Sequence, residues 1–287
     1  MTISRRPIYL ALVLIALILP LSLHLPATSA AETKEELIKR GDLFFKVRGA
    51  NNIKDKAVPG NILNSIDAYM AAYEAGEPSA ELIIKIMRST YFYVTYAEED
   101  RGKQKEAVTK ALEIGEAGLE LYPESAGINY WMAALWGRWS KAYGKIASAR
   151  EDVVLKIKAY AERTIELDPA YAEGGGYRTL GRLHYKTPRI PFIISWPRKE
   201  LALAYLEKAL KEGPENLTNH LFYAESLIER GRRDEARKEV GFVQAAKYRY
   251  EENIVEVLRA QRNTAELIAI LNDRVDIERI NRVDMNK

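Results

Sequence analysis

The sequence predicts an all-α protein in which successive helices pair antiparallel, and two observations carry this prediction. After residue 32, apolar residues recur at three- and four-residue spacing, with no sustained alternation of the kind that strands show. Three predicted helices also end alike, with prolines at positions 123, 169 and 214 that stand 46 and 45 residues apart. Because the residue before a proline is pushed out of the α region, each proline ends one helix before the next amphipathic segment begins.

The segments around these prolines form an internal repeat with small residues at regular places. Small side chains let two helices approach to the lower end of the ~8–10 Å interaxial range. The matches are in register at several offsets, which favours a tetratricopeptide-repeat (TPR)-like α-solenoid over an alanine-rich bundle. We therefore expect one such domain over residues 32–287. The residues that carry the pattern are Tyr177, Leu180, Gly181, Ala202, Leu206, Ala209, Pro214, Ala224, Leu227, Gly231 and Ala236.

The repeats exceed the usual TPR length of about 34 residues, and the excess is predicted to lie in long inserts. The inserts fall at residues 49–60, 144–153 and 186–201. Inserts in a repeat array map to loops on one face, often the binding face.

The N-terminal residues 1–31 have the pattern of a signal peptide. Arg5 and Arg6 precede an unbroken apolar run over residues 8–19, and small residues follow at 26–31. This pattern favours the ordinary secretory route, with cleavage after Ala30 or Ala31 and a periplasmic location. The alternative is an uncleaved membrane anchor, because residues 8–25 are just long enough to span a bilayer.

Charge and residue types narrow the function. The formal net charge is +3, and residues 32–287 hold 41 basic and 40 acidic side chains, so the sequence does not predict general attraction to nucleic acid or anionic lipid. Without cysteine, neither a thiolate zinc site nor a cysteine nucleophile can form. His184 and His220 are interpreted as structural, and Glu98 to Asp100 as a solvated turn. We expect no catalytic residues, no metal and no cofactor, and hence a binding protein.

Aromatic residues between positions 131 and 143 are the first candidate binding residues. Helical spacing is expected to place Trp131, Trp139 and Tyr143 on one face, with Trp136 nearly opposite. These side chains form either part of the repeat core or one wall of a ligand groove.

A glycine run and an apolar insert supply the other candidates. The run at 174–176 precedes Tyr177 and Arg178, and it indicates either an anion site at a helix start or close packing. The insert at 188–197 contains Phe192 and Trp196, which either dock a partner or fold back onto the solenoid.

Segments 130–139, 167–171, 174–188 and 203–225 together resemble the TatT family. These are the TPR-like T-components found with tripartite ATP-independent periplasmic (TRAP) transporters. The resemblance implies a solenoid that can form homo-oligomers, that partners an extracytoplasmic solute-binding subunit and that passes a small apolar or carboxylate ligand. The chain departs from the family in two ways. It lacks a lipobox cysteine, and it has Ser195 to Arg198 in place of a Gly-Gly-Asp-like turn.

A general periplasmic TPR scaffold for an envelope or secretion assembly is the alternative function. In either case, contact with the membrane is expected only through the N-terminal segment, if that segment stays uncleaved.

We predict that the exported chain begins at Ala31 or Glu32, because the small residues before these positions suit signal peptidase. Osmotic shock should release this form, and N-terminal sequencing of the released protein checks the cleavage site. A membrane-bound form that keeps residues 8–19 would instead establish the anchor.

Overall fold

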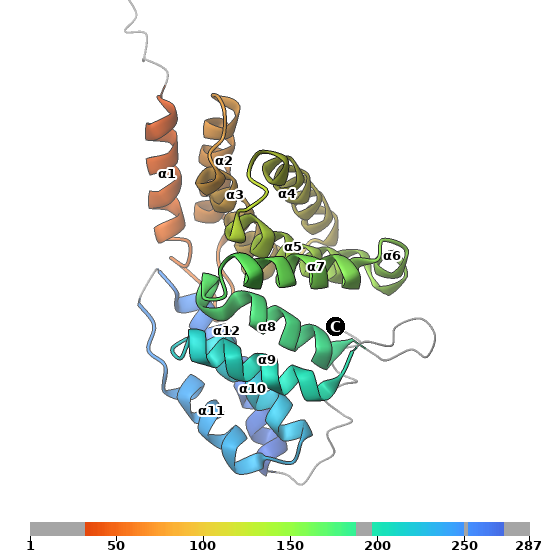
Figure 1. Ribbon diagram of the computed structural model, residues 1–287. Coiled ribbons are helices and arrows are strands. Elements are labelled where there is room, and N and C mark those ends of the chain that lie inside the picture. The colour runs from red at the N-terminus through yellow and green to blue at the C-terminus, as the bar shows by residue number, and fades with distance from the viewer. Residues whose placement is uncertain (1–31, 188–196, 250–251, 273–287) are drawn as a thin grey trace, which may run out of the picture. The chain divides into compact units, whose positions relative to one another are not determined.

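A computed structural model describes residues 32–187, 197–249 and 252–272. The description below concerns the unit that begins at Thr33. Its described part consists of helices without a β-sheet (Figure 1). The helices are α1 (Lys34–Lys46), α2 (Pro59–Glu74), α3 (Ala80–Phe92), the π-helical turn η1 (Tyr93–Ala97), α4 (Arg101–Leu121), α5 (Ala126–Tyr143), α6 (Lys145–Arg150), α7 (Val153–Leu167), α8 (Tyr171–Lys186), α9 (Lys199–Glu212), α10 (Leu217–Glu229), α11 (Arg233–Ala245) and α12 (Ile254–Asn272).

The prolines end helices as the sequence predicts. Helices α4, α7 and α9 each stop two residues before Pro123, Pro169 and Pro214, and α5, α8 and α10 begin shortly after them. Ser125 caps α5 by accepting a hydrogen bond from a backbone N–H, and Asn216 caps α10 in the same way. Helix α8 has no such side-chain cap and begins instead with an irregular turn, which shapes the candidate site.

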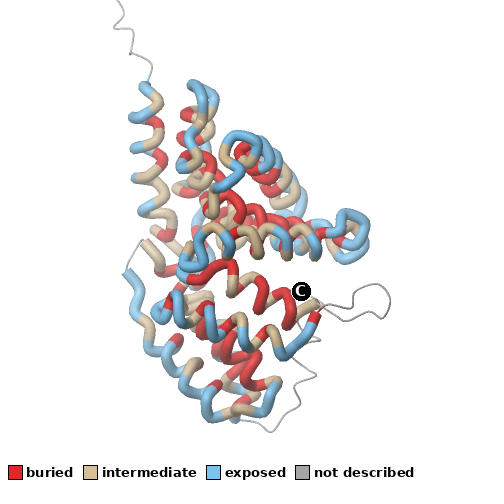
Figure 2. The backbone as a smooth tube through the Cα atoms, in the orientation of Figure 1, coloured by how far each residue is buried: buried red, intermediate tan, exposed pale blue. Residues whose placement is uncertain are grey.

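Antiparallel pairs such as α3–α4, α5–α7, α8–α9 and α10–α11 follow one another along the unit. The first helices of these pairs, α3, α5, α8 and α10, hold the most buried residues (Figure 2). At the α8–α9 pair, a Cβ atom added to Gly181 on α8 would lie only 2.6 Å from Leu206 Cγ on α9. The small residue is therefore required at that position, which confirms the repeat register.

The C-terminal helix α12 contacts the beginning of the unit. Ile254 and Val255 join a core cluster with Ala57 and residues of α2 and η1. Arg259 pairs with the buried carboxylate of Asp55, and Arg262 lies 2.7 Å from the same carboxylate. Repeats in an ordinary solenoid contact only their neighbours, so these contacts across about 200 residues of sequence close the array.

The polar inserts are partly ordered. Residues 49–60 hold an isolated β-bridge between Ile53 and Lys56, and Asp55 in this insert pairs with α12. Residues 144–153 include the short helix α6. Of the apolar insert at 188–197, positions 188–196 lie outside the described residues, and Pro197 is buried.

Glu98 corrects one expectation, because it is not solvated. Its side chain is 14% exposed. It accepts hydrogen bonds from the Tyr93 hydroxyl at 2.5 Å and from the backbone N–H groups of Glu99 and Asp100 at 2.8 and 2.7 Å. The carboxylate thus closes the end of η1 instead of facing water.

Both histidines pack inside the repeats, as expected. His184 Nδ1 accepts the backbone N–H of Arg198 at 3.1 Å, and burial together with the charge of Arg198 lowers its pKa. His220 contacts Glu239 and the carbonyl of Pro214, and these two acceptors raise its pKa against the opposing effect of burial.

We predict that Ala209→Glu lowers the free energy of unfolding by about 3 kcal/mol or more, because Ala209 is fully buried where α9 meets α8. Ala204→Glu is the matched control, since Ala204 is an exposed alanine on the same helix. Denaturant unfolding measures both. Equal stability of the two variants would show that the packing described for α9 is wrong.

Candidate partner-binding site

The helical path changes where α3 runs into η1. In η1 the backbone follows a π-helical turn over Tyr93–Ala97, a local irregularity that is frequent at functional sites. Tyr91, Thr95 and Tyr96 are all half-buried in this stretch. The Tyr96 ring packs at a tilt against Phe92, with ring centroids 5.0 Å apart, and Arg259 of α12 lies 5.2 Å above the Tyr96 ring.

Four aromatic residues from three first helices meet beside this turn. Tyr91 of α3 lies 5.5 Å from Trp131 of α5, and Tyr130 lies 5.0 Å from the same indole. Tyr171 at the start of α8 completes the group, 5.6 Å from Tyr130. We call Tyr91, Tyr130, Trp131 and Tyr171 the inner aromatic cluster. Aromatic rings at these separations attract one another beyond their burial, so the cluster also ties neighbouring repeats together.

Two arginines bind the hydroxyls of this cluster. Arg138 donates to the Tyr91 hydroxyl at 2.9 Å, and Arg178 donates to the Tyr130 hydroxyl at 2.8 Å. Neither guanidinium has a carboxylate within ion-pair distance among the described residues. Arg88, whose Nε lacks a hydrogen-bond partner, also has no such acid and lies 4.1 Å above the Phe45 ring. The cluster is thus bordered by cations that tyrosines and π faces hold in place.

Tyr91 and Arg138 form a hydrogen-bonded pair in which each shifts the pKa of the other. Burial raises the pKa of Tyr91, but the positive charge of Arg138 and its hydrogen bond outweigh burial and lower it. The same contact raises the pKa of Arg138 against its own desolvation. A buried guanidinium that polarises a phenol provides strong hydrogen-bond donors for an anion.

The start of α8 contains a left-handed turn. Ala172, Glu173 and Gly174 have φ values of 52°, 56° and 74°, which glycine tolerates and the other two residues adopt at a cost. Arg178 donates to the carbonyls of Ala172 and Glu173 at 3.2–3.4 Å, and to Asn219 Oδ1 at 2.8 Å. Arg178 is buried and fully engaged, so its role here is to hold the turn.

The glycine run packs closely. All three glycines are buried, and a Cβ added to Gly174 would lie 2.8 Å from Ala209 Cα. Of the two interpretations offered for the run, the structure favours close packing over an exposed anion site.

The structure separates the predicted site residues on α5. Trp131 belongs to the inner aromatic cluster, whereas Trp136, Trp139 and Tyr143 form a second group. Trp136 lies 5.4 Å from Trp139, which stacks on Tyr143 at 4.2 Å. The expectation that Trp136 lies nearly opposite Trp139 is wrong, because residues three apart in a helix are neighbours.

The remaining predicted residues lie elsewhere or cannot be placed. Tyr177 is half-buried, and its ring stacks on that of Tyr205 of α9 with centroids 6.4 Å apart. This ring contact is with α9 and not with the aromatic residues of α5. Phe192 and Trp196 lie outside the described residues. Sequence reasoning missed Tyr91 and Arg138. The available signal was the unusual aromatic density of residues 91–96, where four of six side chains are aromatic.

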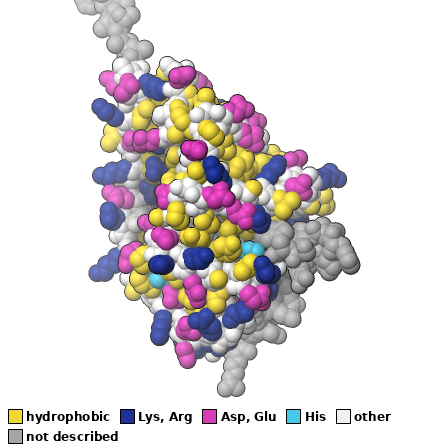
Figure 3. Space-filling model, in the orientation of Figure 1, with side chains coloured by type: hydrophobic (Ala, Val, Ile, Leu, Met, Phe, Trp, Pro, Cys, Tyr) yellow, Lys and Arg dark blue, Asp and Glu magenta, His cyan; other side chains and the backbone are white. Residues whose placement is uncertain are grey.

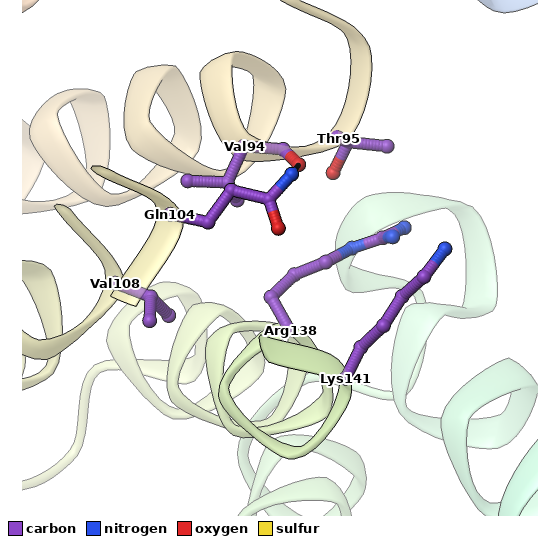
Figure 4. A pocket seen from close by; sticks show the side chains of 6 residues that line it. All are labelled: Val94, Thr95, Gln104, Val108, Arg138 and Lys141. Carbon is purple, nitrogen blue, oxygen red and sulfur yellow. Dashed lines mark hydrogen bonds between the residues drawn. The ribbon is translucent and has the colours of Figure 1, made fainter. Parts of the chain in front are cut away.

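A small pocket opens next to Arg138 (Figure 4). It has a volume of about 70 Å³ and lies among η1, α4 and α5. Its lining residues are Val94, Thr95, Gln104, Val108, Arg138 and Lys141.

Two properties of the described residues concern metal binding and membrane insertion. Across the described ranges, no group of three or more histidine, aspartate or glutamate side chains is arranged to hold a metal ion. Within the same ranges, none of the helices combines the length and apolarity needed to cross a membrane.

Family models match two parts of the chain. The model for regulator of microtubule dynamics protein 1-3 matches residues 52–194, just under half of the chain, and a tetratricopeptide-repeat model matches residues 200–246. Curated proteins yield no match.

Among solved structures, one TPR protein shows the same fold. A thermophilic TPR protein from Thermus thermophilus superposes with a TM-score of 0.57 at 14% identity, covering 82% of this chain and all of that one. A MamA protein (TM-score 0.44, 16% identity, 82% and 95% coverage) and the TPR2AB domain of yeast Sti1 in its pHSP90 complex (0.28, 12%, 81% and 98%) are more distant.

The chain is therefore an all-α, TPR-like solenoid, in which residues 200–246 match a tetratricopeptide-repeat model. Solenoids of this kind present extended surfaces built from successive repeats, on which protein partners commonly bind.

We predict that Ala172→Gly raises the free energy of unfolding by about 0.5–1 kcal/mol, because glycine adopts the left-handed conformation without the Cβ clash. Ala170→Gly is the control, since Ala170 has an ordinary right-handed φ of −88° and gains nothing from glycine. Thermal unfolding compares the two. If Ala172→Gly were the more destabilising change, the strained turn would not exist.

Proposed function

We propose that this chain is an exported TPR-like accessory subunit that docks a protein partner, namely the extracytoplasmic solute-binding subunit of a TRAP transporter. The inner aromatic cluster and its arginines are the observation that carries the proposal. Tyrosine, tryptophan and arginine dominate the energetics of protein interfaces, because they combine large apolar area with directional donors.

The position of this cluster supports docking. Its members come from α3, α5 and α8, so a partner laid across them touches three repeats at once. On the face drawn in Figure 3, hydrophobic side chains gather in the upper middle, and basic and acidic side chains surround them and are interspersed over the lower half. An apolar centre with a charged rim is the usual organisation of a protein interface.

The sequence resemblance to TatT proteins supplies the identity of the partner. The predicted signal peptide would place this chain in the compartment where solute-binding subunits work. A general periplasmic scaffold would use the same surface with another partner, so the test must name the partner it uses.

We predict that Trp131→Ala weakens binding of the solute-binding subunit by about 2 kcal/mol, roughly a thirtyfold rise in Kd. The change removes a half-buried indole at the centre of the cluster. The double variant Phe192→Ala with Trp196→Ala is expected to lose a similar amount if the apolar insert also docks. Calorimetric titration with the purified solute-binding subunit of a TRAP transporter from the same organism measures both.

Trp139→Ala is the matched control, because it removes an indole from the second aromatic group of the same helix. Circular dichroism verifies that all variants keep their helices. Parent-like affinity in both Trp131→Ala and the insert variant would refute docking through these surfaces. Absence of binding by the parent chain would refute the TRAP-specific partner.

A further inference from the structure

The pocket beside η1 has the chemistry of an anion site. Among the described residues, its lining includes two cationic side chains from one helix, Arg138 and Lys141, and no carboxylate. Figure 4 shows these side chains running side by side from α5 toward the segment that carries Thr95. Positive charge concentrated in a recess with low-dielectric walls attracts anions more strongly than the same charge on an open surface.

Arg138 carries a charge that its own fold leaves uncompensated. Among the described residues, its hydrogen-bonding contact is with the neutral phenol of Tyr91 at 2.9 Å, and its guanidinium lies 4.8 Å from that ring. A half-buried guanidinium has five donors, and one phenol satisfies few of them. Withdrawing a cation from water is costly unless an anion or several acceptors replace the water.

Thr95 supplies an independent observation. Its hydroxyl is buried and makes no hydrogen bond of good geometry, although it lies close enough to Tyr91 to help lower the pKa of that phenol. Buried hydroxyls nearly always have a hydrogen-bond partner, so an orphan that borders a pocket indicates a missing acceptor. Thr95 also lies in the π-helical turn, where the backbone departs from the regular helix and carries this side chain to the pocket wall.

Gln104 defines the other wall. Its amide nitrogen donates to the Glu98 carbonyl at 2.7 Å, which leaves the amide oxygen on the pocket side. An anion therefore has to sit toward Arg138 and Thr95, where the donors are, and away from that oxygen.

Size restricts the ligand to a small group. A water molecule requires at least about 10–15 Å³ of such volume, so a pocket of about 70 Å³ accommodates a few water-sized atoms. That is the size of one carboxylate or phosphate group, not of a peptide.

We propose that this pocket binds a small oxyanion, a carboxylate or a phosphate group, through Arg138 and the Thr95 hydroxyl. Lys141 contributes charge at the mouth. The pocket shares Arg138 with the proposed docking surface, but a small anion needs no second protein, so the two hypotheses fail in separate experiments.

The test titrates the purified protein with sodium acetate and with sodium phosphate, each compared with sodium chloride at equal ionic strength. Calorimetry gives Kd, and thermal unfolding gives the stabilisation that follows from ligand binding to the folded state. We expect acetate or phosphate to bind and to raise Tm beyond chloride. Binding of acetate alone identifies a carboxylate site, and binding of phosphate alone identifies a phosphate site.

Three variants locate the site. Arg138→Gln should raise Kd about tenfold or more, because it removes the charge-assisted donors. Thr95→Val keeps the shape of the side chain and should raise Kd roughly three- to tenfold without lowering the stability of the free protein. Arg163→Gln is the control, since it removes the same charge from an exposed pair with Glu166 on α7.

Thr95→Val keeps the test decisive if Arg138→Gln fails to fold. The proposal is overturned if neither anion binds more tightly than chloride. It is equally overturned if Thr95→Val binds like the parent, or if Arg163→Gln weakens binding as much as the pocket variants do.

Discussion

The buried carboxylate of Asp55 is the contact on which closure of this repeat array depends. Burial raises the pKa of Asp55, and the guanidinium groups of Arg259 and Arg262 more than reverse that effect, so the group stays charged. A buried charge is tolerated only when paired, and both cations are on α12. The last described helix must therefore lie against an insert near the beginning of the unit, and a second pair between Arg48 and Glu256 fixes it there.

Closure of the array changes the surfaces that are available for ligand binding. In an open solenoid the first helices line a broad concave surface. Here α12 approaches η1, placing Arg259 over Tyr96 and against the carbonyl of Thr95. The pocket on the other side of this turn, among η1, α4 and α5, is small and is lined by Arg138 and Lys141. The docking surface that we propose is wide and aromatic, whereas the anion pocket that we propose is narrow and cationic.

Local signals in the sequence were sufficient for the helices and their pairing, because proline and small residues act within one turn or one contact. The prolines at 123, 169 and 214 and the close approach at Gly181 are of this kind. The site was only partly predictable. Trp131 and Arg178 were candidates, but their link through Tyr130 joins residues 48 apart, and the pairing of Asp55 with Arg259 joins residues 204 apart. The spacing of residues along a single helix cannot predict such contacts. It also cannot predict the left-handed turn at 172–174.

Basic and acidic side chains are nearly equal in number in this chain, but they are distributed unevenly in space. Acidic side chains pair with lysine and arginine at the surface and across repeats, as Glu225 does with Arg182. Arg88, Arg138 and Arg178 depend instead on tyrosine hydroxyls, carbonyls and π faces. These neutral partners hold the guanidinium groups in place without cancelling their charge. These three arginines therefore have no acidic partner among the described residues of a chain whose formal net charge is +3, and Arg138 lies beside the π-helical turn η1.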